Sequence, residues 1–307
     1  MNRFNFLKEY NKALIENINL KNIPKNLNLI FDGGAFNGGF AGGIMMYLKS
    51  MEEQKLIKIH CVSGCSIGSL LGVWYLSDCI LEGFNCFEQF MDYFKKNTNL
   101  RAYKTIVATY INIVFKKKAP DFINQLNGRL FITYYNVKTH KQKTVSKFRN
   151  KAHLIDCIIR SSHVPFVING KASYKKKYMD GISPYLIKND VPSLFIKLMT
   201  INKCTRAFMI KSENNIHYRV LAGIADANDF FTTGKSDMCS YIHEWSSLNF
   251  FQLRIRELVF FYIFSLIEWI TVLKTYVPDV ITNSMLYNVT INTLHNLYRD
   301  LCGQILV

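Results

Sequence analysis

Hydrophobic and polar positions in the first half of the chain alternate in blocks that predict strands and helices in turn. Short apolar runs at 28–31 and 56–62 are typical of buried strands. Apolar residues at helical spacing follow each run, from Phe40 to Met51 and again along 69–84. Strands that alternate with helices of this length are typical of parallel βαβ units. We therefore expect an α/β fold with a mainly parallel central sheet.

The middle of the chain predicts a hairpin, a helix and a short strand. Apolar and aromatic residues in 128–148 flank the turn-like segment KTHKQ, which predicts a β-hairpin. Residues 151–163 have helical periodicity, and the helix should end ahead of Pro165, because the residue before a proline disfavours the helical conformation. A short strand is expected to end at Asp180.

The last third of the chain predicts two strands and then aromatic-rich helices. The strands are expected at 194–201 and at 206–212. The longest charge-free apolar run, 258–267, is too short for a membrane span, which needs about 20 apolar residues. A buried helix is the favoured interpretation of this run, and a helix lying in a membrane interface is the alternative.

The chain is basic and aromatic-rich, with a formal net charge of +16, 23 Phe and 17 Tyr in 307 residues. Nucleic acids and anionic membrane surfaces are the common partners of such chains. The sequence has no zinc-finger, RNA-recognition or basic-helix pattern, so nucleic acid is not the expected partner. An anionic membrane surface is therefore the expected one.

The cysteines and the N-terminal segment bear on the cellular compartment. The eight cysteines show no paired metal-ligand spacing, so we expect reduced, packed thiols and no metal site. The N-terminal segment has no continuous apolar stretch like that of a signal peptide. We expect an intracellular, cytoplasmic protein with peripheral membrane association.

A serine bracketed by glycines follows the second predicted strand, in the sequence Gly64-Cys65-Ser66-Ile67-Gly68. Glycine is costly inside a helix or strand, but here it allows a strand and a helix to approach each other at a sharp turn. Such a turn presents the serine hydroxyl at the end of the sheet, where the next helix directs its N–H groups. Ser66 is therefore a candidate nucleophile for acyl transfer.

Acyl transfer also needs hydrogen-bond donors for the oxyanion. Gly33 and Gly34 directly follow the first strand in DGGAFNG (32–38), where amides without a neighbouring Cβ can turn toward a ligand. A simple tight turn and a phosphate-binding loop are alternatives, although the spacing matches neither GxGxxG nor a P-loop. The oxyanion interpretation is the favoured one.

The base that would activate the serine has a weaker sequence signal. None of the seven histidines has the sequence setting of a triad partner. Asp180, directly before Gly181, is the other candidate, because burial can raise the pKa of a carboxyl toward the working pH. On local grounds alone, an Asp-Gly turn is the simpler interpretation.

These segments, in this order, resemble the patatin-like phospholipases over about 27–190. The matching pieces are DGGAFNG (32–38), GCSIG (64–68) and DG (180–181). RSSHVPFVI (160–168) is similar to the helix end that packs near the catalytic pair in that family, and the hairpin also resembles the family's hairpin. The resemblance implies a three-layer αβα fold with a mainly parallel sheet, followed by a helical, aromatic-rich C-terminal region.

The resemblance implies a Ser-Asp dyad in which Asp180 accepts the proton of Ser66. The expected oxyanion donors are the amides of Gly33, Gly34, Ala35 and Ile67, and the expected motif glycines are Gly38, Gly64, Gly68 and Gly181. No metal or organic cofactor is implied. The implied substrates are fatty-acyl esters of phospholipids first and neutral glycerolipids second.

Two departures from the family loop keep another interpretation open. Ala35 replaces the third glycine and Asn37 replaces a basic residue. Alanine offers its N–H without strain only at negative φ. A catalytically silent lipid-binding protein of the same fold is therefore the alternative to an active phospholipase.

The expected organisation has three regions: an N-terminal helical extension (1–26), a patatin-like catalytic core (27–205) and a mostly helical region (206–307) that packs on the core or on a membrane surface. Lys175, Lys176 and Lys177 lie just ahead of Asp180. They are candidates for contact with anionic headgroups, and a solvated loop is the alternative.

Overall fold

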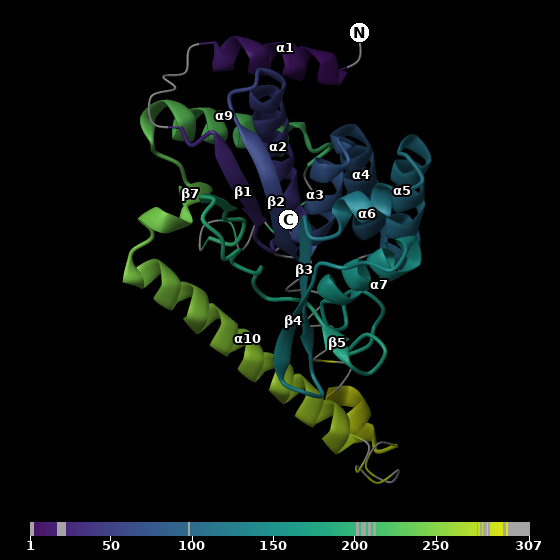
Figure 1. Ribbon diagram of the computed structural model, residues 1–307. Coiled ribbons are helices and arrows are strands. Elements are labelled where there is room, and N and C mark those ends of the chain that lie inside the picture. Colours follow the sequence, from purple (N-terminus) through teal and green to yellow (C-terminus); the bar gives the residue numbers. More distant parts are fainter. Residues whose placement is uncertain are drawn as a thin grey trace.

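The computed structural model describes residues 3–16, 23–97, 99–200 and 213–274, together with residues 203, 207, 210, 276, 278, 281, 283–290 and 293 (Figure 1). The strands are β1 (Asn26–Phe31), β2 (Lys58–Cys65), β3 (Leu130–Asn136), β4 (Lys141–Val145), β5 (Tyr178–Met179), β6 (Ser193–Ile196) and β7 (Cys239–Tyr241). The helices are α1 (Arg3–Ile15), α2 (Gly38–Glu53), α3 (Ile67–Leu76), α4 (Ile80–Asn97), α5 (Tyr103–Lys117), α6 (Phe122–Leu126), α7 (Lys151–Ser161), α9 (His217–Thr233) and α10 (Ser247–Lys274).

The central sheet has the order β4-β3-β2-β1-β6-β7, and β5 pairs with β3. Strands β1, β2, β3 and β6 are parallel to their neighbours in this group, whereas β4, β5 and β7 pair antiparallel. The register places Phe31 beside Gly64 and Cys65 beside Thr133, so β1 and β2 end at the same edge. The α/β class and the mostly parallel sheet expected from the sequence are confirmed.

The order of the strands also shows where a site can form. The chain passes from β1 to β2 to β3 in one direction along the sheet, and it returns to the other side of β1 with β6. In open α/β sheets, ligands bind outside the carboxyl ends of the strands at such a reversal. The loops that follow β1 and β2 lie at this position.

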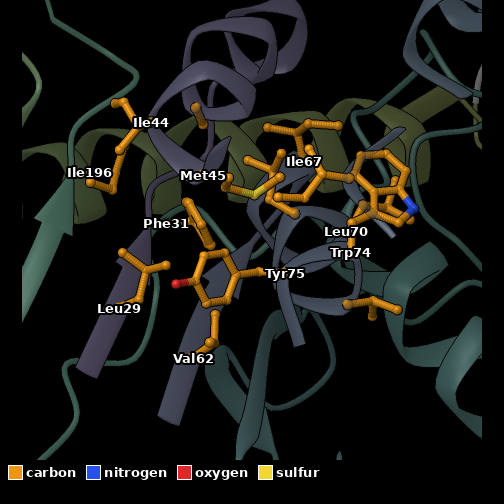
Figure 2. Packing of buried hydrophobic residues seen from close by; sticks show 14 of the residues in the cluster. Leu29, Phe31, Ile44, Met45, Val62, Ile67, Leu70, Trp74, Tyr75 and Ile196 are labelled. Carbon is orange, nitrogen blue, oxygen red and sulfur yellow. The ribbon is translucent and has the colours of Figure 1, made fainter. Parts of the chain in front are cut away.

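Helices α2, α3 and α7 flank the sheet and form one continuous core with it. Figure 2 shows side chains of β1 and β2, among them Phe31 and Val62, close to Met45 of α2 and Tyr75 of α3. All four are fully buried or nearly so. Burial of a side chain of this size contributes about 1.5–3 kcal/mol to folding. Strands of the core therefore need apolar residues, and runs of such residues in the sequence predict these strands.

Several local predictions are confirmed, and two are wrong. The hairpin (β3 and β4), the helix at 151–161 and a short strand before Asp180 are present. The single helix expected along 69–84 is two helices, because the chain turns at Asp78, whose φ of 52° a continuous helix cannot accommodate. The strand expected at 194–201 ends at Ile196. The strand expected at 206–212 lies largely outside the described residues.

The prediction that 258–267 is a buried helix is also wrong. This run lies in α10, where Leu258, Tyr262 and Leu266 are 52%, 68% and 60% exposed. The opposite side of the helix packs on the protein, through Phe264 against Tyr135 of β3. Among the described residues, no helix has the length and hydrophobicity that crossing a bilayer requires.

Helix α9 packs so closely on α2 that glycine is required on both helices. A Cβ on Gly43 would lie 2.0 Å from the carbonyl oxygen of Val220, and one on Gly223 would lie 1.9 Å from that of Phe40. We expect Gly223→Ala to lower the free energy of unfolding by about 2–4 kcal/mol, because backbone must shift to admit the methyl group. Denaturant unfolding measures this loss. Leu221→Ala, at an exposed position of the same helix, should stay within about 0.5 kcal/mol of the parent protein.

Candidate active site

Ser66 lies in the turn between β2 and α3, with φ 53° and ψ −129°. Positive φ at a residue other than glycine costs about 1–3 kcal/mol, so the surrounding structure must enforce it. The flanking glycines explain how: a Cβ on Gly64 would lie 2.2 Å from the carbonyl oxygen of Gly68, and one on Gly68 would lie 2.6 Å from that of Phe31. The turn therefore requires glycine on both sides of the serine.

Asp180 follows β5 and is held close to Ser66 by the end of α7. The carbonyl oxygen of Ser161 accepts the N–H of Ser66 and the N–H of Gly181, each at 3.1 Å. The N–H of Asp180 donates to the carbonyl oxygen of His163 at 3.0 Å. The end of α7 thus fixes the backbone of both residues, and it overlaps the segment RSSHVPFVI that the family resemblance places near them.

The carboxyl of Asp180 lies beside the serine, and its Oδ2 is buried without a hydrogen-bond partner. Its Oδ1 accepts the N–H of Ile182 at 3.0 Å. Burial raises the pKa of Asp180 to about 6, and the negative charge of Asp32 acts in the same direction. The nearby side chain of Ser66, the hydrogen bond from Ile182 and the charge of Arg256 oppose this rise in pKa. A carboxyl with a pKa raised to this range can accept a proton at neutral pH.

The glycine-rich loop after β1 lies against the serine. A Cβ on Gly33 would lie 3.3 Å from the Cβ of Ser66, and one on Gly34 would lie 2.6 Å from the Cβ of Leu198. The N–H of Gly33 donates to Oδ1 of Asp32 at 2.9 Å, so this amide, expected among the oxyanion donors, is already engaged. A Cβ on Gly38 would lie 2.7 Å from the side chain of Ile67.

Ala35 adopts a conformation that its residue type disfavours. Its φ is 45°, although an alanine amide was expected only at negative φ. The loop continues from there into a short 3-10 helix, Ala35–Asn37, and then into α2. The backbone therefore keeps a left-handed residue, normally glycine, at the position where the family glycine is replaced.

Two arginines from the C-terminal third hold this loop, and no local sequence pattern marks either of them. Arg256 of α10 pairs with Asp32 through two hydrogen bonds of 2.8 Å, and Asp32 is fully buried. Arg219 of α9 donates to Oδ1 of Asn37 at 2.9 Å and pairs with Glu213. A buried cation thus contacts residue 37, although that residue itself is neutral.

A narrow apolar cavity opens beside Ser66. It is lined by Ala35, Phe36, Ser66, Ile67, Phe87, Phe90, Leu100, Tyr103, Ser162, Val164, Val167 and Ile168. Most of these side chains are hydrocarbon or aromatic, so the cavity suits an alkyl chain better than a polar group. Ala35 and Ile67, whose amides are candidate oxyanion donors, line it together with Ser66.

Most of the remaining candidate residues have partners of their own. Lys175 pairs with Asp156 at 2.7 Å, and Lys177 lies over the ring of Tyr178, whereas Lys176 is exposed. His163 is buried, which lowers its pKa, and its Nε2 lies 3.3 Å from the carbonyl oxygen of Lys171.

Within the part of the chain that the structure describes, no group of three or more His, Cys, Asp or Glu side chains could hold a metal ion. In the same part of the chain, the free thiols are Cys61, Cys65, Cys79, Cys86, Cys157 and Cys239.

A serine in a strand-to-helix turn, beside a glycine-rich loop at the edge of a mostly parallel sheet, is the arrangement of serine acyl hydrolases. The chain belongs to the patatin-like phospholipase family, whose family model matches residues 29–189, more than half of the sequence. The family resemblance read from the sequence is thereby confirmed. Members of this family are generally serine esterases or phospholipases. A comparison with curated proteins finds no match.

Proposed function

We propose that this protein hydrolyses fatty-acyl esters of lipids through a Ser66–Asp180 dyad and an acyl-enzyme intermediate. The observation that carries the proposal is the placement of the two side chains: a serine in a strained turn lies beside an aspartate whose Oδ2 is buried without a hydrogen-bond partner and whose pKa is raised to about 6. At pH 7 and above this carboxyl is mostly ionised and can accept the serine proton.

The first half of the reaction forms the acyl-enzyme. Oγ of Ser66 attacks the ester carbonyl carbon while its proton passes to Asp180, and the carbonyl oxygen becomes an oxyanion. The amides of Gly34 and Ala35, with Ile67 at the start of α3, are the proposed donors to that oxyanion. When the C–O bond of the ester breaks, Asp180 returns the proton to the leaving alcohol or lysolipid.

The second half releases the fatty acid. A water molecule gives its proton to Asp180 and attacks the acyl carbon, again through an oxyanion at the same amides. Collapse of this intermediate breaks the bond to Oγ, and the proton on Asp180 returns to Ser66. The dyad ends in its starting state, and the cycle uses no group outside the chain other than water and substrate.

The surroundings of the serine support a lipid substrate. The apolar cavity beside Ser66 offers a place for an acyl chain, and the family makes phospholipids the first candidates and neutral glycerolipids the second. Lys176 and Lys177 are the proposed headgroup contacts of the 175–177 cluster, because Lys175 is paired with Asp156.

Labelling with a fluorophosphonate probe tests the nucleophile directly. We expect one covalent adduct per chain, located at Ser66 by peptide mass spectrometry, because the probe reacts with an activated serine and mimics the acyl-transfer intermediate. Ser66→Ala should abolish the adduct, and Ser246→Ala, which removes an exposed serine, should retain it. Absence of labelling would favour the silent lipid-binding protein, and an adduct at another serine would contradict the dyad.

A further inference from the structure

Helix α10 has two apolar sides, and the residues that the structure describes cover one of them. Its inner side carries Phe264, which packs against Tyr135, and Arg256, which pairs with Asp32. Its outer side carries a row of large apolar residues spaced three or four apart: Phe251, Ile255, Leu258, Tyr262, Leu266 and Trp269. Each of these six is between 43% and 68% exposed. We call this row the α10 stripe.

A stripe of this length is unusual on a free surface. The six residues cover about five turns of helix, and large contiguous apolar patches on proteins mark sites of protein or membrane interaction. Tyr262 and Trp269 add the amphipathic rings that are enriched at the level of lipid headgroups. The described helices are not suited to span a bilayer, so a helix of this kind would lie in the interface plane.

Cations adjoin the stripe at the tip of the β3–β4 hairpin. Lys138 and Lys141 are exposed there, and the ring of His140 lies 6.0 Å from that of Phe261 on α10. The N–H of Val137 donates to the carbonyl oxygen of Lys177, so the 175–177 segment lies against the tip of the same hairpin. An apolar helix face flanked by lysines is complementary to a bilayer that contains anionic phospholipids.

The helix that carries the stripe also contacts the candidate active site. On one turn of α10, Arg256 reaches Asp32 in the glycine-rich loop, and Glu257 accepts the hydroxyl of Ser183 at 2.5 Å. A groove of about 850 Å³ beside the helix extends from Phe251 and Ile255 to Asp32. Figure 1 shows α10 at the opposite end of the molecule from α1 and α9.

We propose that the α10 stripe, with Lys138 and Lys141 beside it, docks this protein on bilayers containing anionic phospholipids. Docking by this face brings the groove and the glycine-rich loop next to the lipid surface. The inference builds on the proposed lipid hydrolysis, because it names the surface on which that reaction takes place. Binding is nevertheless measurable without turnover.

Vesicle co-sedimentation of full-length protein carrying Ser66→Ala measures docking in the absence of hydrolysis. We expect binding to vesicles of phosphatidylcholine with phosphatidylserine and weaker binding to phosphatidylcholine alone. Combined Tyr262→Ser, Leu266→Ser and Trp269→Ser should weaken binding by roughly 30-fold or more, because most of the inserted apolar area is lost. Combined Lys138→Glu and Lys141→Glu should weaken binding to the anionic vesicles at least about tenfold, and high salt should weaken it as well.

Matched controls come from the opposite end of the molecule. Phe6, Tyr218 and Leu221 are similarly exposed on α1 and α9, and their combined replacement by serine should leave vesicle binding unchanged. Combined Lys25→Glu and Lys58→Glu makes the same charge change at the other edge of the sheet. This control tests whether vesicle binding depends on the location of the replaced lysines or on the net charge of the protein.

Two results would overturn the docking proposal. One is wild-type binding by the stripe variant. The other is a dimeric parent protein and a monomeric stripe variant, as measured by light scattering, with equal vesicle binding. The stripe would then be covered by a second copy of the chain. Hydrolysis of a soluble short-chain ester, measured in proteins that keep Ser66, tests the dyad separately. Its loss alone would count against the proposed function and not against docking.

Discussion

Replacing Asp180 with asparagine should lower kcat/KM for a soluble short-chain ester by about 10³-fold or more, because the amide cannot accept the proton of Ser66. Asparagine has nearly the shape of aspartate, and its Oδ1 can still accept the N–H of Ile182. The site should therefore lose its base without losing its geometry. Initial rates over a range of substrate concentrations give the measurement.

The two members of a dyad should not contribute independently. Ser66→Ala and the double variant Ser66→Ala/Asp180→Asn should show the same residual activity, because removal of either group stops the same step. His163→Gln separates the dyad from a histidine triad. The ring of His163 lies near the carbonyl oxygen of Lys171, so this variant should keep most of the activity. Loss of activity in His163→Gln, with activity retained in Asp180→Asn, would refute the dyad.

The same Asp180→Asn substitution should stabilise the fold at alkaline pH. The pKa of Asp180 is raised from 3.8 in the unfolded chain to about 6 in the folded protein, so the folded state prefers the protonated carboxyl. Ionisation above pH 6 thus costs up to about 3 kcal/mol of folding free energy, a cost that fades as the pH falls toward 4. Denaturant unfolding of parent and variant at pH 8 and at pH 4 measures the difference. An equal stability gain at both pH values would contradict the raised pKa.

The elements that sequence reasoning located are those with a strong local signal. The β1 and β2 runs, the β3–β4 hairpin and the α7 helix each combine apolar periodicity with a turn or a proline. The glycines at 64 and 68 are an equally clear sequence signal, because the strand-to-helix turn leaves no room for a Cβ at either position. Sequence spacing therefore predicted the edge of the sheet at which the candidate site lies.

The remaining features depend on contacts that no local pattern encodes. Arg256 lies 224 residues from Asp32 in sequence, and Arg219 lies 182 residues from Asn37. A single arginine in a helix gives no sign of a distant carboxylate. Likewise, the apolar run in α10 shows that a helix forms but not which of its sides is covered. The break at Asp78 rests on one backbone angle, a φ of 52°. Aspartate tolerates this conformation better than most residues, but an aspartate within a helical pattern does not by itself predict it.

The second large effect is expected at Arg256. Its replacement by glutamine leaves the carboxylate of Asp32 buried without its partner, and breaking such a pair typically costs about 3–5 kcal/mol of stability. Arg254→Gln, on the same helix but with a largely exposed side chain, should cost less than about 1 kcal/mol. Thermal and denaturant unfolding distinguish the two variants.

The pH dependence of hydrolysis separates a positioning role for Arg256 from a purely structural one. The positive charge of Arg256 lowers the pKa of Asp180, and the negative charge of Asp32 raises it by more. Activity should fall on the acid side as Asp180 is protonated, with a midpoint near pH 6 in the parent protein. Arg256→Gln should move this midpoint to higher pH, because the pKa of the base rises when the cation is lost.

The double variant Asp32→Asn/Arg256→Gln removes both charges and avoids the unpaired carboxylate, so it should recover much of the stability lost in Arg256→Gln. Its acid midpoint should lie below that of the parent, because the larger effect, that of Asp32, is removed with the smaller one. Opposite displacements in the single and double variants require both charges to act on the base. If both variants kept the parent midpoint, Arg256 would only hold α10 on the glycine-rich loop, and Asp180 would be insulated from the pair.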